Sequence, residues 1–406
     1  MRVQRPDGAP VADAVVSVEQ VRHAFGFGNL GFARAHGTSD PRLEGLFLDL
    51  FNAATLPFYW REFEPVAGEP HTARLRDAAR WFADRGVRLK GHPLLWHTLA
   101  PAWLLDLDDT SAEAAMRARI ARETSAFAGL VDQWDAINEA VILPVFTAED
   151  NAVTRLARRK GRVEMVRLAF DAAREGDPGA GLVLNDFDLS PAYEHLIEEC
   201  LDAGITLDAI GLQTHMHQGF RGEDELAGIV ERFSRFGLPL QLTEVSLVSG
   251  ELMPGHVVDL NDHQVEEWPT TPEGEARQAD ELERFHRQML AEPAVESITL
   301  WGLSDADAWL GAPSGLVRAD GSLKPAYRAL HRLIKDEWWL APTEVRTDAS
   351  GSFELHGFAG EYRVSAGAAT AALTLPAVRG CSATVTLDPA RASAVPTTSP
   401  EVPDSD

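Results

Sequence analysis

Two glutamates stand where catalytic carboxylates are needed. Glu139 closes the apolar run at 134–138, and Glu244 closes the run at 240–243. Short apolar runs predict buried strands, and the ends of such strands form the active face of an α/β barrel. Two carboxylates that converge there can protonate a leaving oxygen and attack a sugar carbon. The pair therefore suggests the cleavage of a glycosidic bond.

Polar and aromatic side chains also follow the other apolar runs. Amides and imidazoles can hydrogen-bond sugar hydroxyls, and indole rings can stack on the face of a pyranose. A single residue of this kind would mean little, but their concentration at strand ends favours a sugar site. The residues concerned are Trp96, His97, Asn138, Asn185, Gln213, His215 and Trp301.

Eight short apolar runs alternate with amphipathic helical patterns between about residues 25 and 335. This alternation predicts a parallel sheet wrapped by helices, and eight is the number of strands in a TIM barrel. The predicted fold class is therefore α/β, with a TIM (β/α)8 barrel. The runs lie at 25–30, 51–56, 87–96, 133–138, 181–186, 208–213, 239–243 and 297–302.

The two ends of the chain do not fit the barrel pattern. Residues 1–24 contain a strand-like stretch, and residues 341–388 alternate apolar and polar side chains between glycine-rich turns. A lone hairpin is marginal in water, so we expect the N-terminal strands to pack on the small all-β module of residues 341–388. The catalytic barrel would occupy residues 25–340. The stretch 389–406 is rich in Ala, Ser, Pro and Thr and is typical of a disordered tail.

Charge and composition narrow the possible partners. The formal net charge of −25 opposes binding to nucleic acid or to an anionic membrane, whereas a carbohydrate partner is compatible with it. No apolar run reaches the ~18 residues of a membrane helix, and the first residues lack the apolar segment of a signal peptide. We expect a cytoplasmic protein from the sequence as given, or a secreted one if the true start lies upstream. We expect no cofactor and no metal, because His215 and His217 lack a neighbouring Cys or helical His pair.

The motifs after the predicted strands resemble glycoside hydrolase family 10, a family best known for endo-β-1,4-xylanases. They stand in the order of that family over about residues 25 to 335, and as a set they are highly specific. They are KGHPLLWH at 90–97, WDAINEA at 134–140, LND at 184–186, GLQTH at 211–215, LTE at 242–244, LWGLSDADAW at 300–309 and KPAY at 324–327.

The resemblance implies roles for the matching residues. Glu139 would be the acid/base and Glu244 the nucleophile of a retaining double displacement, with the carboxyls ~5–5.5 Å apart. We expect partial burial and the charge of Glu244 to raise the pKa of Glu139. Asn138 would hold the 2-hydroxyl of the reacting sugar. The other implied substrate-binding residues are Lys90, Trp96, His97, Asn185, Gln213, His215, Trp301 and Trp309.

Two segments differ from the family pattern. Where the xylanases usually carry a Glu-Asn pair and a Lys before a tryptophan, residues 55–60 read Thr-Leu-Pro-Phe-Tyr-Trp. Buried hydroxyls without a partner cost ~1–3 kcal/mol each, so an unaltered xylan chain should bind less well there. Ser246 stands where the family usually has an Asp that orients His215.

Several functions remain open at this point. The leading interpretation is a retaining β-glycosidase that resembles endo-1,4-β-xylanases. A diglycosidase-like enzyme that releases an oligosaccharide from a plant small-molecule glycoside is the alternative within this class, and the apolar segment 55–59 favours it. A non-catalytic carbohydrate-binding barrel is the alternative from another class, although both glutamates are intact. A metal-dependent barrel hydrolase lacks its set of metal ligands.

Overall fold

The computed structural model describes residues 1–38, 40–377 and 382–388, and the chain divides into two compact units. One unit is residues 26–333, and the other combines residues 1–25 with the described residues from 334 onward. The tail predicted at 389–406 lies outside the described residues. Among the helices of the described chain, none has the length and apolar character needed to cross a bilayer.

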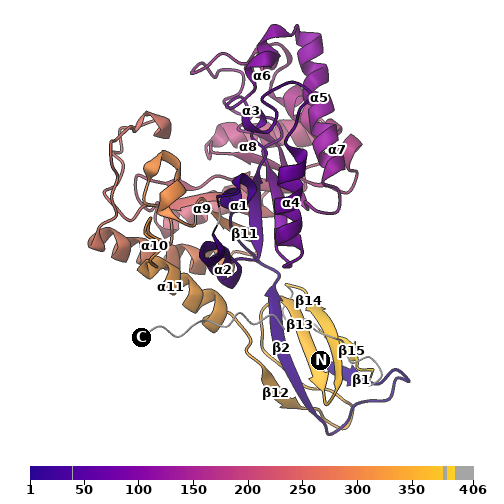
Figure 1. Cartoon of the computed structure of the whole chain (residues 1–406). Coiled ribbons are helices and arrows are strands. Elements are labelled where there is room, and N and C mark those ends of the chain that lie inside the picture. Colours follow the sequence, from indigo (N-terminus) through magenta and orange to yellow (C-terminus); the bar gives the residue numbers. More distant parts are fainter. Residues whose placement is uncertain (39, 378–381, 389–406) are drawn as a thin grey trace. The chain divides into compact units, whose positions relative to one another are not determined.

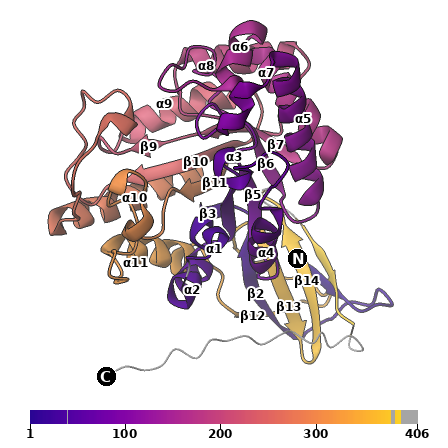
Figure 2. The ribbon, with the colours of Figure 1, turned by 45° about the horizontal axis from the view of Figure 1, so that its top comes forward.

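Eight parallel strands form a closed barrel in the larger unit (Figure 2). Strand β11 pairs with both β10 and β3, and this double pairing closes the ring. The predicted TIM barrel is thereby confirmed. The strands are β3 (Gly26–Leu30), β4 (Ala53–Pro57), β5 (Arg88–His92), β6 (Gln133–Asn138), β7 (Gly181–Asp186), β8 (Ala209–Leu212), β10 (Leu240–Leu247) and β11 (Val295–Leu300).

Burial on both faces explains why these segments read as continuous apolar runs. All eight residues of β10 and all four of β8 are buried, because helices cover the outside of the barrel and side chains fill its interior. A short strand, β9 (His215–Met216), pairs with the last residues of β10. This pairing extends β10 past the expected end at residue 243, so that Glu244 lies inside the strand.

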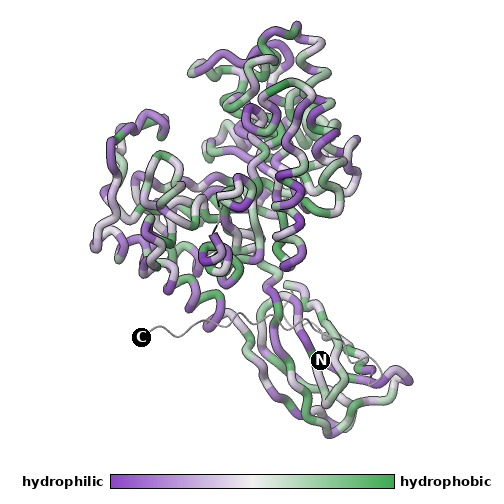
Figure 3. Tube along the Cα trace, viewed as in Figure 1, coloured by the Kyte–Doolittle hydropathy of each residue, from purple (hydrophilic) through white to green (hydrophobic). Residues whose placement is uncertain are grey.

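Helices surround the barrel (Figure 1). Capping residues mark where several of them begin. Asp40 caps α2 and Thr271 caps α10, and each helix has a proline at its first position, where no N–H partner is needed. Apolar and polar segments alternate along these helices, as expected for elements with one buried face (Figure 3). The helices are α1 (Phe32–His36), α2 (Pro41–Leu50), α3 (Trp60–Phe63), α4 (Thr72–Ala83), α5 (Asp109–Ala126), α6 (Ala152–Lys160), α7 (Arg162–Gly176), α8 (Pro191–Asp202), α9 (Glu223–Ser234), α10 (Pro272–Ala291) and α11 (Pro325–His331).

The smaller unit is built around the N-terminal strand β2 (Val15–His23). This strand lies between β12 (Thr343–Arg346) and β13 (Gly360–Ala366), and β14 (Ala369–Leu375) completes an antiparallel sheet of four. A second, parallel pair joins β1 (Arg2–Gln4) to β15 (Thr384–Thr386). The sheet therefore combines segments from both ends of the sequence.

The second segment of this unit begins at residue 334, seven residues before the start of the β module expected at residue 341. Hydrogen bonds to β2 account for the difference: His23 Nε2 lies 3.1 Å from the carbonyl oxygen of Ile334, and the Leu340 N–H donates to Gln20 Oε1 over 3.1 Å. The core of the unit is formed by apolar side chains from both segments, including Val16, Val18, Phe353, Tyr362, Val364, Val385 and Leu387.

Truncating Val18 should destabilise the smaller unit, whereas truncating Val15 on the same strand should not. Val18 is fully buried and Val15 is 53% exposed. Val18→Ala removes two buried methyl groups and leaves a cavity, so we expect a loss of about 2 kcal/mol in the free energy of unfolding. Urea denaturation of both variants measures the difference. Equal losses in the two variants would contradict the central position of β2.

Candidate active site

Glu139 lies just past the carboxyl end of its strand, and Glu244 lies inside the extended strand β10. Glu139 directly follows β6 and is 9% exposed as a residue, while Glu244 in β10 is 4% exposed. Glu139 has a φ of 56°, a left-handed conformation that is uncommon for residues other than glycine and that concentrates at functional sites. Its N–H donates to the carbonyl of Asn185 over 2.9 Å. This hydrogen bond helps to hold the strained turn that carries the carboxyl group.

Two asparagine amides join the carboxyl groups. Asn138 Nδ2 donates to Glu139 Oε1 over 3.0 Å. Asn185 Nδ2 donates both to Asn138 Oδ1 over 2.8 Å and to Glu244 Oε1 over 2.9 Å. The hydroxyl of Thr243 donates to Asn185 Oδ1 over 2.6 Å, which orients this second amide. Residues from β6, β7 and β10 thus form one continuous hydrogen-bonded network.

The rest of the Glu139 carboxyl is surrounded by ring and amide nitrogens. Trp96 Nε1 donates to Oε2 over 2.8 Å, and Gln213 Nε2 donates to Oε1 over 3.2 Å. His97 Nε2 lies 3.7 Å from Oε2. Burial lowers the pKa of His97 to about 4, so its imidazole is neutral at neutral pH and adds no positive charge beside Glu139.

The surroundings of Glu139 favour its protonated form. Burial is the largest cause, followed by the nearby charges of Glu244 and Asp186, and together they raise the pKa of Glu139 to about 8. The hydrogen bonds from Trp96 and Gln213 act in the opposite direction but do not outweigh burial. At neutral pH this carboxyl can therefore donate a proton.

Glu244 is held in its charged form. Burial acts to raise its pKa, but hydrogen bonds from His215 and Asn185 and the charge of His92 outweigh it, so that the pKa lies below the usual value. His215 Nε2 lies 3.2 Å from Glu244 Oε2, and its Nδ1 lies 3.0 Å from the hydroxyl oxygen of Ser246. A carboxylate can only accept, so Nε2 donates to Glu244 and a neutral ring accepts from Ser246 at Nδ1. The hydroxyl of Ser246 is thus the hydrogen-bond partner of His215 at Nδ1.

A set of rings that we call the aromatic wall borders these carboxyls. It consists of Phe32, Tyr59, His92, Trp96 and Trp301. The ring of Tyr59 lies 5.7 Å from each of Phe32, His92 and Trp96, and the ring of Trp301 lies 5.8 Å from Phe32 and 5.3 Å from His92. The structure thus brings Trp96 and Trp301 together, as expected. Sequence reasoning did not identify Phe32 or Tyr59 as site residues, although both follow strand ends closely.

Trp309 also contacts His215, the histidine that hydrogen-bonds to Glu244. Its ring is 5.0 Å from that of His215 and 5.4 Å from that of His217, while His215 is 6.1 Å from Trp301. His215, which hydrogen-bonds to Glu244, therefore contacts both Trp301 and Trp309.

Tyr59 is the one residue of the segment 55–59 that is not buried. Thr55, Leu56 and Phe58 are at most 2% exposed, whereas Tyr59 is half-buried. Its hydroxyl makes no hydrogen bond to any residue that the structure describes. Burial, and then the charges of Glu244 and Glu139, raise the pKa of Tyr59 well above its usual value. The phenol therefore remains a neutral donor that faces two carboxyl groups.

Lys90 has a different environment from the other expected sugar-binding residues. Its Nζ lies 3.0 Å from Asp135 Oδ2, and the same oxygen lies 2.7 Å from His92 Nδ1. Lys90 also borders a polar cavity of about 340 Å³ at the amino ends of the strands, together with Arg88 and Gln241. Its observed contact is thus with the fully buried Asp135, which holds His92 in the aromatic wall.

Asp186 is a further buried carboxyl beside the site. It is fully buried, it accepts hydrogen bonds from the N–H groups of Val141 and Asp188 over 3.0 Å each, and burial raises its pKa to about 7. Sequence reasoning noted it only as the neighbour of Asn185 at a strand end. Its charge adds to the rise in the pKa of Glu139.

The described residues hold no group of three or more His, Cys, Asp or Glu side chains that is arranged to bind a metal ion. His215 and His217 lie 5.6 Å apart between ring centroids. Burial lowers the pKa of His217 to about 3. The described site therefore consists of carboxyl, amide, imidazole and aromatic groups.

Two curated relatives show what this chain is similar to. Anti-sigma-I factor RsgI6 of Acetivibrio thermocellus is 26% identical over 374 residues, which cover 90% of this chain and 44% of the relative. Endo-1,4-beta-xylanase/feruloyl esterase of Xylanibacter ruminicola is 25% identical over 336 residues, which cover 73% of this chain and 44% of the relative. The chain thus spans less than half of the length of these two relatives.

A solved structure and a family model cover the barrel. The structure of GH10 from Paenibacillus barcinonensis superposes with a TM-score of 0.64 at 25% identity, covering 77% of this chain and 95% of that one. The family model described as glycosyl hydrolase family 10 matches residues 30–333. The resemblance that the strand-end motifs indicated is confirmed, and the chain belongs to glycosyl hydrolase family 10.

Proposed function

We propose that this chain hydrolyses β-1,4-linked xylose chains with retention of configuration, with Glu139 as acid/base and Glu244 as nucleophile. The observation that carries the proposal is the pair of buried carboxyls whose pKa values are shifted in opposite directions within one hydrogen-bonded network. Opposite shifts support one carboxyl as the proton donor and the other as the attacking group. The relative named as an endo-1,4-beta-xylanase supports xylan as the substrate.

The chemistry follows in two steps. The Glu244 carboxylate attacks the anomeric carbon while the bond to the leaving oxygen breaks, and Glu139 transfers its proton to that oxygen. Glu139 is then an anion, which takes a proton from water as the water oxygen attacks the glycosyl-enzyme. The bond to Glu244 breaks, so that both carboxyls return to their starting forms.

The remaining polar and aromatic residues would bind and orient the sugar. Asn138 would hold the 2-hydroxyl, because its amide lies between the two carboxyls. The hydrogen bond from His215 keeps Glu244 ionised, and the aromatic wall offers ring faces on which a pyranose can stack. We propose as sugar contacts the expected set of Lys90, Trp96, His97, Asn138, Asn185, Gln213, His215, Trp301 and Trp309, and we add Tyr59.

A second candidate is a diglycosidase-like enzyme that acts on a small-molecule glycoside. The observation that favours it is the burial of Thr55, Leu56 and Phe58, which leaves this part of the site with the Tyr59 hydroxyl as its exposed polar group. A chain of unmodified xylose would find few partners there. The two candidates share the same carboxyl chemistry and differ in what surrounds the reacting sugar.

A substrate panel separates the candidates. We expect the wild type to cleave xylo-oligosaccharides, and Glu139→Gln to lower kcat/KM by ~10²–10⁴-fold, since general acid catalysis contributes this much. The loss should shrink for an aryl xyloside whose phenol leaves without a proton. Glu244→Gln should abolish both reactions, and the exposed Glu266→Gln should change neither.

Proton NMR of the first product anomer tests retention, and plant glycosides in the same panel test the second candidate. Inversion, or full activity in Glu244→Gln, would contradict the proposed mechanism. Faster cleavage of the plant glycosides than of xylan would favour the second candidate.

Glu139→Gln should also stabilise the protein at alkaline pH. The folded wild type holds the Glu139 proton up to a pKa of about 8, whereas the unfolded chain loses it near the usual 4.5. Glu139 therefore contributes a loss of stability as pH rises from 4.5 to 8, by up to about 1.4 kcal/mol per pH unit, and the variant lacks this contribution. Urea denaturation at pH 4, 6 and 8.5 measures the difference between the two proteins. A constant difference across this range would be evidence against a raised pKa of Glu139.

Tyr59→Phe should impair catalysis without affecting stability. The substitution removes a hydroxyl that has no partner among the described residues, so the melting temperature should hardly change. If the hydroxyl binds the sugar, kcat/KM should fall roughly tenfold or more. Tyr193→Phe is the matched control, because the Tyr193 hydroxyl donates to the buried carbonyl of Leu184 over 2.6 Å. That variant should lose stability and keep its kcat/KM; an unchanged kcat/KM in Tyr59→Phe would remove Tyr59 from the sugar contacts.

A further inference from the structure

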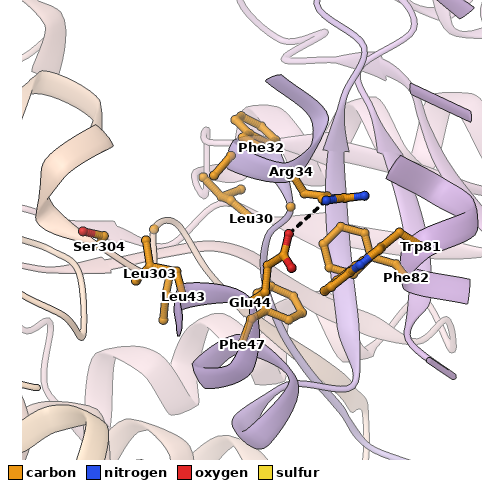
Figure 4. A pocket seen from close by; sticks show the side chains of 13 residues that line it. Leu30, Phe32, Arg34, Leu43, Glu44, Phe47, Trp81, Phe82, Leu303 and Ser304 are labelled. Carbon is orange, nitrogen blue, oxygen red and sulfur yellow. Dashed lines mark hydrogen bonds and ion pairs between the residues drawn. The ribbon is translucent and has the colours of Figure 1, made fainter. Parts of the chain in front are cut away.

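An apolar cavity of about 100 Å³ lies beside the aromatic wall, within the barrel unit (Figure 4). Helices α1, α2 and α4 and the segment that follows β11 contribute its lining. Aromatic and aliphatic side chains predominate, and these are Leu30, Phe32, Leu43, Phe47, Trp81 and Phe82. The catalytic chemistry described above uses none of the space inside it.

The cavity and the aromatic wall share one residue, Phe32. Phe32 lines the cavity, and its ring also contacts Tyr59 at 5.7 Å and Trp301 at 5.8 Å. Gly302, Leu303 and Ser304, which directly follow Trp301, line the cavity as well. A group attached to a sugar in the catalytic site would therefore meet this cavity at Phe32.

The size of the cavity suits one planar ring. Apolar cavities of roughly 150 Å³ lined by leucine, isoleucine and phenylalanine stay dry and bind benzene. The ring faces and edges of Phe47, Phe82 and Trp81 offer stacking and edge contacts, which stabilise aromatic pairs by ~0.5–1.5 kcal/mol beyond the burial of area. A sugar ring, with a hydroxyl on most of its carbons, would leave these groups without partners.

The ion pair between Arg34 and Glu44 in the lining favours an uncharged ligand. Arg34 Nη1 lies 3.1 Å from Glu44 Oε1, and the Arg34 guanidinium lies 5.1 Å from the ring centroid of Trp81. Figure 4 shows this pair within the lining, between Phe32 and Phe47 in that view. Because Glu44 already balances the charge of Arg34, a free carboxylate gains little there. Within the described chain the Arg34 side chain forms one hydrogen bond, through Nη1, so the other N–H groups of its guanidinium are available to a neutral acceptor such as an ester carbonyl.

We propose that this cavity is a subsite for a neutral aromatic acyl group that the substrate carries as an ester on a sugar hydroxyl. The identification of the substrate as a sugar rests on the proposed function, while the preference for a neutral aromatic ring rests on the cavity alone. The subsite selects decorated chains over plain ones, and it compensates for the missing polar contacts along residues 55–58.

Fluorine NMR with a small probe tests the cavity without any need for catalysis. Methyl 4-fluorobenzoate should bind the wild type saturably and at least about tenfold more tightly than the 4-fluorobenzoate anion. Leu43→Trp fills the cavity and should abolish binding. Leu48→Trp, a control on the same helix outside the lining, should not.

Glu44→Gln gives a second, independent readout, because it keeps the volume of the cavity and frees the charge of Arg34. In this variant the 4-fluorobenzoate anion should bind more tightly than in the wild type, which reverses or removes the preference for the ester. This arm also decides the case if Leu43→Trp does not fold. Equal binding of ester and anion in the wild type, or no binding of either, would overturn the proposal.

Kinetics then connect the cavity to the substrate. The ratio of kcat/KM for a benzoylated xylo-oligosaccharide to that for the plain one should exceed one in the wild type and in Leu48→Trp, and it should fall in Leu43→Trp. Probe binding in a protein that cleaves no glycoside would contradict the proposed function and leave the cavity's preference for a ring intact. Cleavage of plain chains without probe binding would overturn the subsite and leave the proposed function intact.

Discussion

Two carboxyl groups buried in one water-poor site cannot both carry a charge at low cost, and the active site of this chain is organised around that constraint. Burial and mutual repulsion favour protonation of both, and hydrogen bonds then decide which carboxyl keeps its charge. Glu244 receives donors from His215 and Asn185 and stays ionised. Glu139 lies near Asp186 as well as Glu244, so the local negative charge works against its ionisation. Two identical side chains thus differ in their protonation, which is the difference that the proposed acid and nucleophile require.

The same constraint explains several features of the surrounding fold. The left-handed turn at Glu139 is held by a hydrogen bond to the β7 backbone, and β9 extends β10 so that Glu244 is gripped within a strand. Closure of the barrel through β10 and β11 brings the ends of distant segments to one face. The turn, the extended strand and the closed barrel each restrict the position of a carboxyl group, and that position determines its charge. The strain is tolerated because the buried network around it is nearly complete.

Sequence reasoning predicted the barrel and its family. It named as sugar contacts the residues that hydrogen-bond to the two glutamates, because each of these residues lies at or follows a strand end. The periodic apolar runs reported the buried strands directly, and parallel strands place their carboxyl ends at one edge. Tyr59 and Phe32 were missed because an aromatic residue after an apolar run reads equally well as packing. The contact of Lys90 with Asp135 was not foreseen either. Lys90 and Asp135 lie on neighbouring strands, and which side chains meet across two strands depends on how the barrel closes.

By itself the sequence determined the order and type of the barrel elements, because buried strands and half-buried helices differ in the spacing of their apolar residues. It also determined the residue types at the strand ends, and hence the family. Only the tertiary structure decided how those residues differ in charge, which rings form the aromatic wall, and that a ring-sized cavity lies beside Phe32. These properties depend on distances between segments that are far apart in the sequence. The pKa shifts and the shape of the cavity arise from how these segments pack against one another, and the sequence of one segment does not specify which others it will contact.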